Sequence, residues 1–246
     1  MKTNVLIMLM TGLCVLASVG YGATVGSDNA GNYTTWNNGS NQGTGFGAWD
    51  IWTSGGGAGQ FIEGVAAGFG NINTSGKAFG MWGSPDYVNC QRQFAGGALS
   101  EGQTFSIRVA KMWRNGNAGI DVFDASWNNL FNFNIGGDDY TAKGSSLGWA
   151  YHGDTIVELS VTRVSGNAGT VVLKRYTNYV SGACLVNSVT YNETFAGAPN
   201  AFKLYCGATG GGANNNFYAN DLGIVPEPAG LLAVVGAMLM LRRVRG

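Results

Sequence analysis

The chain has 246 residues, of which 41 are glycine and only 11% are charged, and its formal charge at pH 7 is zero. Without the charged residues of the two ends, the body holds 10 basic and 13 acidic residues. A mildly acidic body lacks the basic patch that a phosphate backbone requires, which argues against nucleic acid as a partner. The low charge and the abundance of Gly and Asn suit a protein that meets extracellular polymer.

Residues 1–23 have the layout of a secretory signal peptide. Lys2 supplies one positive charge, an apolar stretch runs from Val5 to about Ala17, and small residues follow. The apolar core is shorter than the roughly 18 residues of a spanning helix, which disfavours a retained membrane anchor. We therefore expect a signal helix, cleavage by signal peptidase near Gly22 or Ala23, and export through the inner membrane.

Three cysteines remain after the leader: Cys90, Cys184 and Cys206. An exported protein can form disulfides, so one bond plus a free thiol is one interpretation, and three small, partly buried thiols is the other. The sequence leaves the pairing open. Since it contains one histidine and no Cys-x-x-Cys pair, no metal or cofactor site is expected.

Residues 24–224 predict a single all-β domain. In 102–113, the apolar residues Phe105, Ile107 and Val109 alternate with polar ones, as in a strand with one buried face. Gly- and Asn-rich turns separate similar segments, and no helix longer than a turn or two is expected. These features predict an antiparallel β-sandwich. The further predicted strands are 118–127, 129–137, 154–164, 169–177, 184–191, 201–209 and 216–225.

The first third of the body is less regular. Large aromatic residues stand among Gly, Asn, Ser and Thr, which is unusual for a low-complexity linker because exposed aromatics are costly. We interpret this part as loops and edge strands that close over the sandwich. The aromatic residues in question are Trp36, Phe46, Trp49, Trp52 and Phe61.

Residues 225–246 form a distinct tail with a short apolar run, 229–241, between a Pro-Glu-Pro and three arginines. Thirteen residues make a helix of about 20 Å, less than the roughly 30 Å hydrocarbon core. The arginines favour the cytoplasmic side, and the prolines keep the preceding segment extended for a protease cleft. A permanent single-span anchor is the alternative. The residues that define the tail are Pro226, Glu227, Pro228, Arg242, Arg243 and Arg245.

This tail resembles the PEP-CTERM sorting signal, which implies recognition of the Pro-Glu-Pro by an exosortase and export alongside extracellular polysaccharide. The protein would be anchored in the inner membrane before processing, and would lie at the cell surface or in the extracellular matrix afterwards. More weakly, "DNAGNYTTWNNGSNQGTGFGAW", "EGQTFSI" and "NNNFYANDLGI" are similar to a concanavalin-A-like jelly-roll domain. That resemblance implies a sandwich fold and a tendency to bind sugars.

A glycan-cleaving enzyme would need two suitably spaced carboxylates. Asp121 and Asp124 fall on opposite sides of a strand, and Asp138 and Asp139 sit in a turn, where calcium binding is a second interpretation. His152 lies near an aspartate in the sequence, but no nucleophile motif accompanies it. We therefore expect no catalytic residues and a protein that is not an enzyme.

Aromatic residues are the better functional clue, because sugar C–H faces stack on rings while amides and carboxylates bind hydroxyls. Core packing is the alternative for each residue. The expected function is a non-catalytic surface or matrix protein, with a carbohydrate-binding module as the alternative and a glycoside hydrolase less favoured. The candidate carbohydrate-binding residues are Trp82, Tyr87, Trp113, Trp127, Trp149 and Tyr151.

Overall fold

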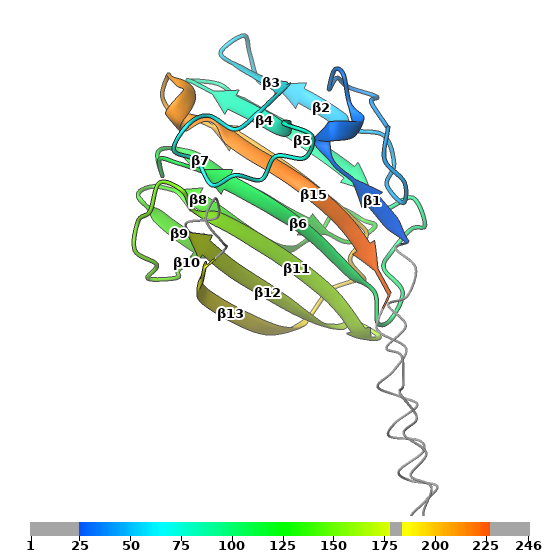
Figure 1. Ribbon diagram of the computed structural model, residues 1–246. Coiled ribbons are helices and arrows are strands. Elements are labelled where there is room, and N and C mark those ends of the chain that lie inside the picture. The colour runs from blue at the N-terminus through cyan, green and yellow to red at the C-terminus, as the bar shows by residue number, and fades with distance from the viewer. Residues whose placement is uncertain (1–24, 178–183, 227–246) are drawn as a thin grey trace, which may run out of the picture. The chain divides into compact units, whose positions relative to one another are not determined.

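The structure, a computed structural model, describes residues 25–177 and 184–226. Within these ranges the chain is almost entirely strand, and helix is limited to two 3-10 turns, η1 (Ala30–Asn32) and η3 (Ala213–Asn215). The strands form two antiparallel sheets that pack as a sandwich (Figure 1). The predicted all-β sandwich without longer helices is confirmed for the described part of the body.

The first sheet has eight strands, and its longest members are adjacent in space (Figure 1). Seven strands follow one path and β1 (Gly26–Asp28) pairs with β15 beside it. The path runs through β13 (Cys184–Thr194), β12 (Ala168–Thr177), β11 (Ile156–Ser165), β6 (Thr104–Lys111), β15 (Phe217–Val225), β4 (Ala78–Gly83) and β3 (Ala58–Glu63).

The second sheet has seven strands. Its order is β10 (Ser145–Ser146), β9 (Asp139–Ala142), β8 (Asn129–Gly136), β7 (Asn117–Phe123), β14 (Ala201–Gly207), β5 (Tyr87–Gln93) and β2 (Asp50–Thr53). The strands β4 and β5 lie in 62–101, where the sequence pattern predicts no strand.

The core lies between the inner faces of the two sheets. Phe105, Ile107 and Val109 of β6 point inward and are fully buried, as their alternation predicted. From the other sheet, Phe202 and Leu204 of β14 meet them, and the rings of Phe105 and Phe202 stack at 4.9 Å. Lys203 and Tyr205 alternate with these residues and therefore point outward.

The first third closes over the sandwich, as expected. Trp36, Phe46 and Trp49 are buried in the core, and β2 and β3 are edge strands of the two sheets. Phe61 is only partly buried and packs edge-to-face on Tyr218 at 5.8 Å. Trp52 is the exception to the expectation, because it is exposed on the seven-stranded sheet.

The outer face of the eight-stranded sheet is partly covered by the segment between β3 and β4, which crosses it (Figure 1). Phe69 and Ile72 of this segment are buried against Ile156 and Tyr218. The segment forms a second, smaller apolar cluster outside the main core.

Cys90 and Cys206 are buried free thiols and Cys184 is an exposed free thiol, so the described residues contain no disulfide. The described residues also include no helix with the length and apolar character needed to span a membrane. Pro226 is the last described residue. The expected signal helix in 1–23, Glu227 and Pro228, the segment 229–241 and the three terminal arginines lie outside the described residues.

Candidate functional site

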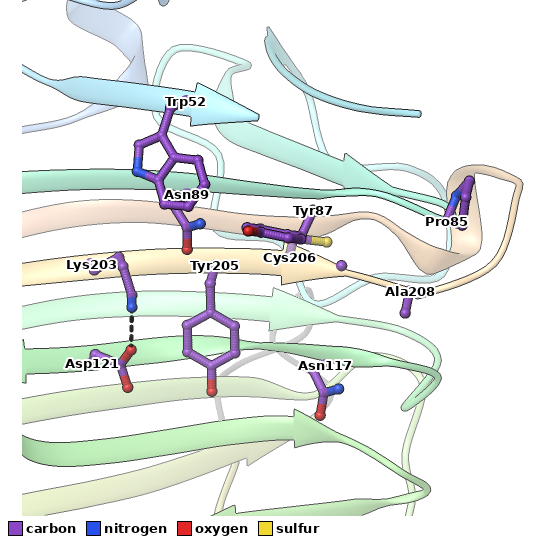
Figure 2. A pocket seen from close by; sticks show the side chains of 11 residues that line it. Trp52, Pro85, Tyr87, Asn89, Asn117, Asp121, Lys203, Tyr205, Cys206 and Ala208 are labelled. Atoms are coloured by element: carbon purple, nitrogen blue, oxygen red, sulfur yellow. Dashed lines mark ion pairs between the residues drawn. The ribbon is translucent and has the colours of Figure 1, made fainter. Parts of the chain in front are cut away.

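The outer face of the seven-stranded sheet carries a pocket of about 500 Å³ (Figure 2). Four adjacent strands, β2, β5, β14 and β7, supply most of its lining. Period-two alternation directs their polar and aromatic residues away from the core, so the pocket follows from the strand register. Its principal side chains are Trp52, Tyr87, Asn89, Asp121, Lys203 and Tyr205.

Two exposed aromatic rings form one wall of this pocket. Trp52 is 44% exposed and Tyr87 is 45% exposed, and the rings meet edge to face with centroids 5.4 Å apart. Tyr87 is opposite Gly207, where an added Cβ would lie 2.5 Å from the Cβ of Tyr87. Glycine at 207 therefore leaves room for the tyrosine, and the pair presents an aromatic surface of the kind that stacks on sugar rings.

A polar network forms the opposite wall. The Lys203 Nζ lies 2.9 Å from the Asp121 Oδ2, and this ion pair is drawn in Figure 2. The Asn132 Nδ2 donates to the Asp121 Oδ1 at 2.7 Å and to the Tyr205 Oη at 2.9 Å. Because each member has partners, the network holds its side chains in fixed positions before any ligand arrives.

Tyr205 reaches this network by crossing β7 at Gly119, its direct neighbour in the sheet (Figure 2). A Cβ at position 119 would lie 2.7 Å from the Tyr205 Oη and 2.0 Å from the Phe133 carbonyl oxygen. Burial raises the pKa of the Tyr205 phenol, so the hydroxyl stays protonated. It can donate to the Asn134 Oδ1 at 3.2 Å or to the Phe133 carbonyl at 3.3 Å.

Two amides in the lining are available to a ligand. Among the described residues, the side chains of Asn89 and Asn117 have no hydrogen-bond partner, and both line the pocket. An amide offers two donors and an acceptor, which match the hydroxyls of a sugar. Aromatic rings, free amides and a fixed ion pair together make a site suited to binding a polar ring.

Trp82 and Tyr87, close in the sequence, lie on different sheets. Trp82 is exposed on β4, where its indole packs over Gly59 of β3, so it is not part of the pocket. Trp149 requires a correction, because it is 7% exposed and packs against Tyr140 at 5.9 Å as a core residue. It cannot offer a stacking surface.

The remaining candidates lie in two smaller pockets. Trp113 and Tyr151 line one of about 290 Å³ together with Arg114. Trp127 lines the other, of about 280 Å³, together with Asp50 and Gln91. Asp50 lies on β2 and Gln91 on β5, two strands that also contribute residues to the main pocket.

The acidic residues have different structural roles. Asp121 is ion-paired in the main pocket, whereas Asp124 accepts hydrogen bonds from Asn128 and Ser126 in the turn after β7. The Asn128 side chain and these backbone contacts lower the pKa of Asp124. Asp138 adopts a φ of 61° in its turn, as expected of a turn former. In 25–177 and 184–226, no three His, Cys, Asp or Glu residues group as a metal site.

His152 is exposed, and its Nδ1 lies 2.5 Å from the Asp154 Oδ1. His152 is therefore a surface residue of the loop between β10 and β11.

Sequence reasoning missed most of the main pocket. The sequence predicts that Trp52 helps to close over the core, but its alternation with the buried Ile51 is a signal for an outward position. Lys203 and Tyr205 alternate with Phe202 and Leu204 in the same way. What the sequence could not give is the spatial order β2-β5-β14-β7, which brings these outward residues together.

No protein-family model matches the chain, and no curated protein matches its sequence. Among solved structures, the chain is similar to part of a sialidase, with 10% identity and a TM-score of 0.50 over 83% of this chain and 18% of that one. It also aligns with a protein of unknown function from Shewanella oneidensis MR-1 (13% identity, TM-score 0.39, 74% of this chain and 80% of that one). A third match is the metal-free Emp46p carbohydrate recognition domain (8% identity, TM-score 0.34, 72% and 87%). Similarity at these identities shows the fold alone, and the chain spans less than a fifth of the sialidase.

Proposed function

We propose that this protein is an exported, non-catalytic surface protein whose β-sandwich binds a saccharide through the outer face of the seven-stranded sheet. The observation that carries the proposal is the exposed Trp52–Tyr87 pair, which faces the fixed Asp121–Lys203 ion pair across one pocket. Aromatic rings beside amides and charged groups are the usual composition of a carbohydrate site. The finer fold assignment within this proposal is a concanavalin-A-like jelly roll.

We propose further that binding is not followed by cleavage. Asp121, the carboxylate in the main pocket, is neutralised by Lys203 and held by Asn132. Both carboxylate oxygens of Asp124 accept hydrogen bonds from Asn128 in the turn after β7. Incubation with candidate polysaccharides should release no reducing sugar. Release that disappears on replacing Asp121, Asp124, Asp138 or Asp139 with Asn would overturn this part of the proposal.

The export and sorting part rests on the sequence of the two ends. A signal peptide would direct the chain outward, and the Pro-Glu-Pro with its apolar run and arginines would present it to an exosortase. Many copies at one surface would then bind polymer with an avidity that a single shallow site lacks.

The direct test is a glycan array probed with the compact unit Ala23–Glu227. The proposal expects selective binding to one class of saccharide. Absence of binding to every saccharide would instead favour a structural matrix component without a ligand.

A further inference from the structure

Two arginines and three aromatic rings that do not line the main pocket alternate in one stack. The guanidinium of Arg114, between β6 and β7, lies 5.3 Å from the ring centroid of Tyr151 and 5.2 Å from that of Tyr140. Arg175 of β12 lies 5.7 Å from the same Tyr140 ring and 5.6 Å from Trp149. Each guanidinium carbon therefore lies over two aromatic rings, a cation–π arrangement that stabilises its charge.

The hydrogen-bond donors in this stack are not used up. Within the described ranges, the Arg114 side chain forms no hydrogen bond and Arg175 donates only to the Ala150 carbonyl. The Nε of each arginine and the hydroxyl of Tyr140 are buried without a partner. The described residues also give neither arginine a carboxylate partner. The buried Nε atoms are out of reach of a ligand, but the Arg114 side chain is only half-buried and lines a pocket, so its other unpartnered donors favour an anionic acceptor from outside.

A pocket opens beside Arg114 that can admit such an acceptor. It measures about 290 Å³ and is lined by Trp113, Arg114, Asn115, Asp138 and Tyr151. Trp113 is exposed and offers a ring for stacking, while the Asn115 Nδ2 is held by the Asn215 Oδ1 at 3.1 Å.

Asp138 is the acidic residue of this lining, and its backbone N–H donates to the Arg114 carbonyl at 3.0 Å. Its negative charge disfavours an anion on its own side of the pocket. An anionic group is therefore directed to the guanidinium of Arg114. Arg114 and Arg175 carry two positive charges there, which outweigh the single negative charge of Asp138.

We infer that this pocket is a second, separate site, in which Arg114 binds the carboxylate of an acidic saccharide and Trp113 stacks on its ring. A planar guanidinium whose two Nη groups have no hydrogen-bond partner among the described residues matches a carboxylate in bidentate geometry, and the flanking tyrosines hold it in place. The saccharide nature of the ligand rests on the proposed function, whereas the carboxylate preference rests on Arg114 alone.

The test compares oligogalacturonate with its methyl ester, which keeps the sugar backbone and removes the charge. Binding to the purified full chain is measured by isothermal titration calorimetry at low salt. We expect the acid to bind at least about ten-fold more tightly than the ester, the size of one charge-assisted bidentate contact. Arg114→Gln should lower the affinity for the acid much more than the affinity for the ester, and so remove this preference. Arg114→Lys keeps the positive charge but loses the bidentate geometry of the guanidinium, so it should retain only part of the preference for the acid.

Two controls separate this site from general charge and from the main pocket. Lys174→Gln removes one positive charge from β12 and should leave the preference intact. Replacing Trp52 and Tyr87 together with alanine should leave the affinities of acid and ester for this separate site, and their ratio, unchanged, so failure of the main pocket is recognised separately. The inference is contradicted if acid and ester bind equally or if neither binds. It is also contradicted if the Arg114→Gln and Lys174→Gln variants lose the preference for the acid to the same extent. Circular dichroism checks folding, and Arg114→Lys carries the test if Arg114→Gln does not fold.

Discussion

Asp28 on β1 and Arg92 on β5 form an ion pair between the two sheets, and neither side chain has any exposed surface. The Tyr33 hydroxyl donates to the Asp28 Oδ2 at 2.5 Å, while Arg92 donates to the Gly47 carbonyl at 2.7 Å and to the Asn41 Oδ1 at 2.6 Å. This buried cluster fastens the irregular first third to the sandwich, and with it β2, which carries Trp52.

Replacing Asp28 with Asn should destabilise the protein strongly, because it leaves the Arg92 charge buried without a counter-ion. The expected loss in the free energy of unfolding is about 3–5 kcal/mol. Urea unfolding measures it, with Asp50→Asn as the matched control at an exposed carboxylate. A loss below about 1 kcal/mol for Asp28→Asn would mean that the ion pair does not organise this region.

Gly119→Ala should disturb both stability and the candidate site. The added Cβ would meet the Phe133 carbonyl oxygen at 2.0 Å and the Tyr205 hydroxyl at 2.7 Å, so β7, β8 or the tyrosine must move. A loss of about 1–3 kcal/mol is typical of such overpacking. Gly56→Ala is the control, since nothing lies within 4 Å of its added Cβ. Equal stability of the two variants in thermal unfolding would argue against the close packing at Gly119.

Lys111 predicts a pH dependence of stability. Its ammonium is buried inside the sandwich and donates to the Asn215 carbonyl at 2.9 Å, and desolvation lowers the pKa of Lys111 to about 8. Since the unfolded lysine titrates near 10.5, the unfolded chain binds more protons above pH 8, and stability should rise with pH there. Burial raises the pKa of Cys206 to about 11, which acts in the opposite direction above pH 9.

Lys111→Met should therefore be more stable than the wild type at pH 7, by about 1–3 kcal/mol. This difference should shrink between pH 8 and pH 9, as the wild-type lysine loses its proton. Urea unfolding of both proteins at pH 7, 8 and 9 measures it. A variant that is less stable at pH 7, or a difference that does not change with pH, contradicts this account of Lys111.

The sequence predicted the sandwich where its strands keep simple alternation, as in β6 with Phe105, Ile107 and Val109. It failed for β4 and β5. In β4, Gly80 leaves space for the Phe61 ring, so the strand shows no polar outer face. In β5, Arg92 occupies an inward position that the pattern reserves for an apolar residue, and its partner Asp28 is 64 residues away.

The site was harder to predict for a related reason. Tyr87 was a candidate from its type alone, but its neighbours Trp52, Lys203 and Tyr205 come from strands whose adjacency no local pattern encodes. Trp149 shows the opposite error, because the sequence predicts a binding residue and the structure buries it. Its neighbours in the sequence are loop residues, and its burial depends on Tyr140 of β9 and Arg175 of β12.

Replacing Pro226, Glu227 and Pro228 together with alanine tests the proposed sorting. In the native host, the variant should accumulate as a membrane-retained form with an intact tail, because the extended recognition segment is lost. Mass spectrometry of the wild type should find the processed form. An intact tail in equal amounts in both proteins would identify the segment as a plain anchor.

The central claim is that saccharide binding occurs at the Trp52–Tyr87 wall of the seven-stranded sheet. Its most direct measurement is the affinity, by isothermal titration calorimetry, of the unit Ala23–Glu227 for the saccharide that binds best on the glycan array. Replacing Trp52 and Tyr87 together with alanine should weaken binding at least about ten-fold, since each ring contributes stacking and buried area. Trp82→Ala, which removes an exposed tryptophan from the other sheet, should leave the affinity unchanged. Unchanged binding in the double variant, or an equal loss in Trp82→Ala, would contradict the assignment of the site.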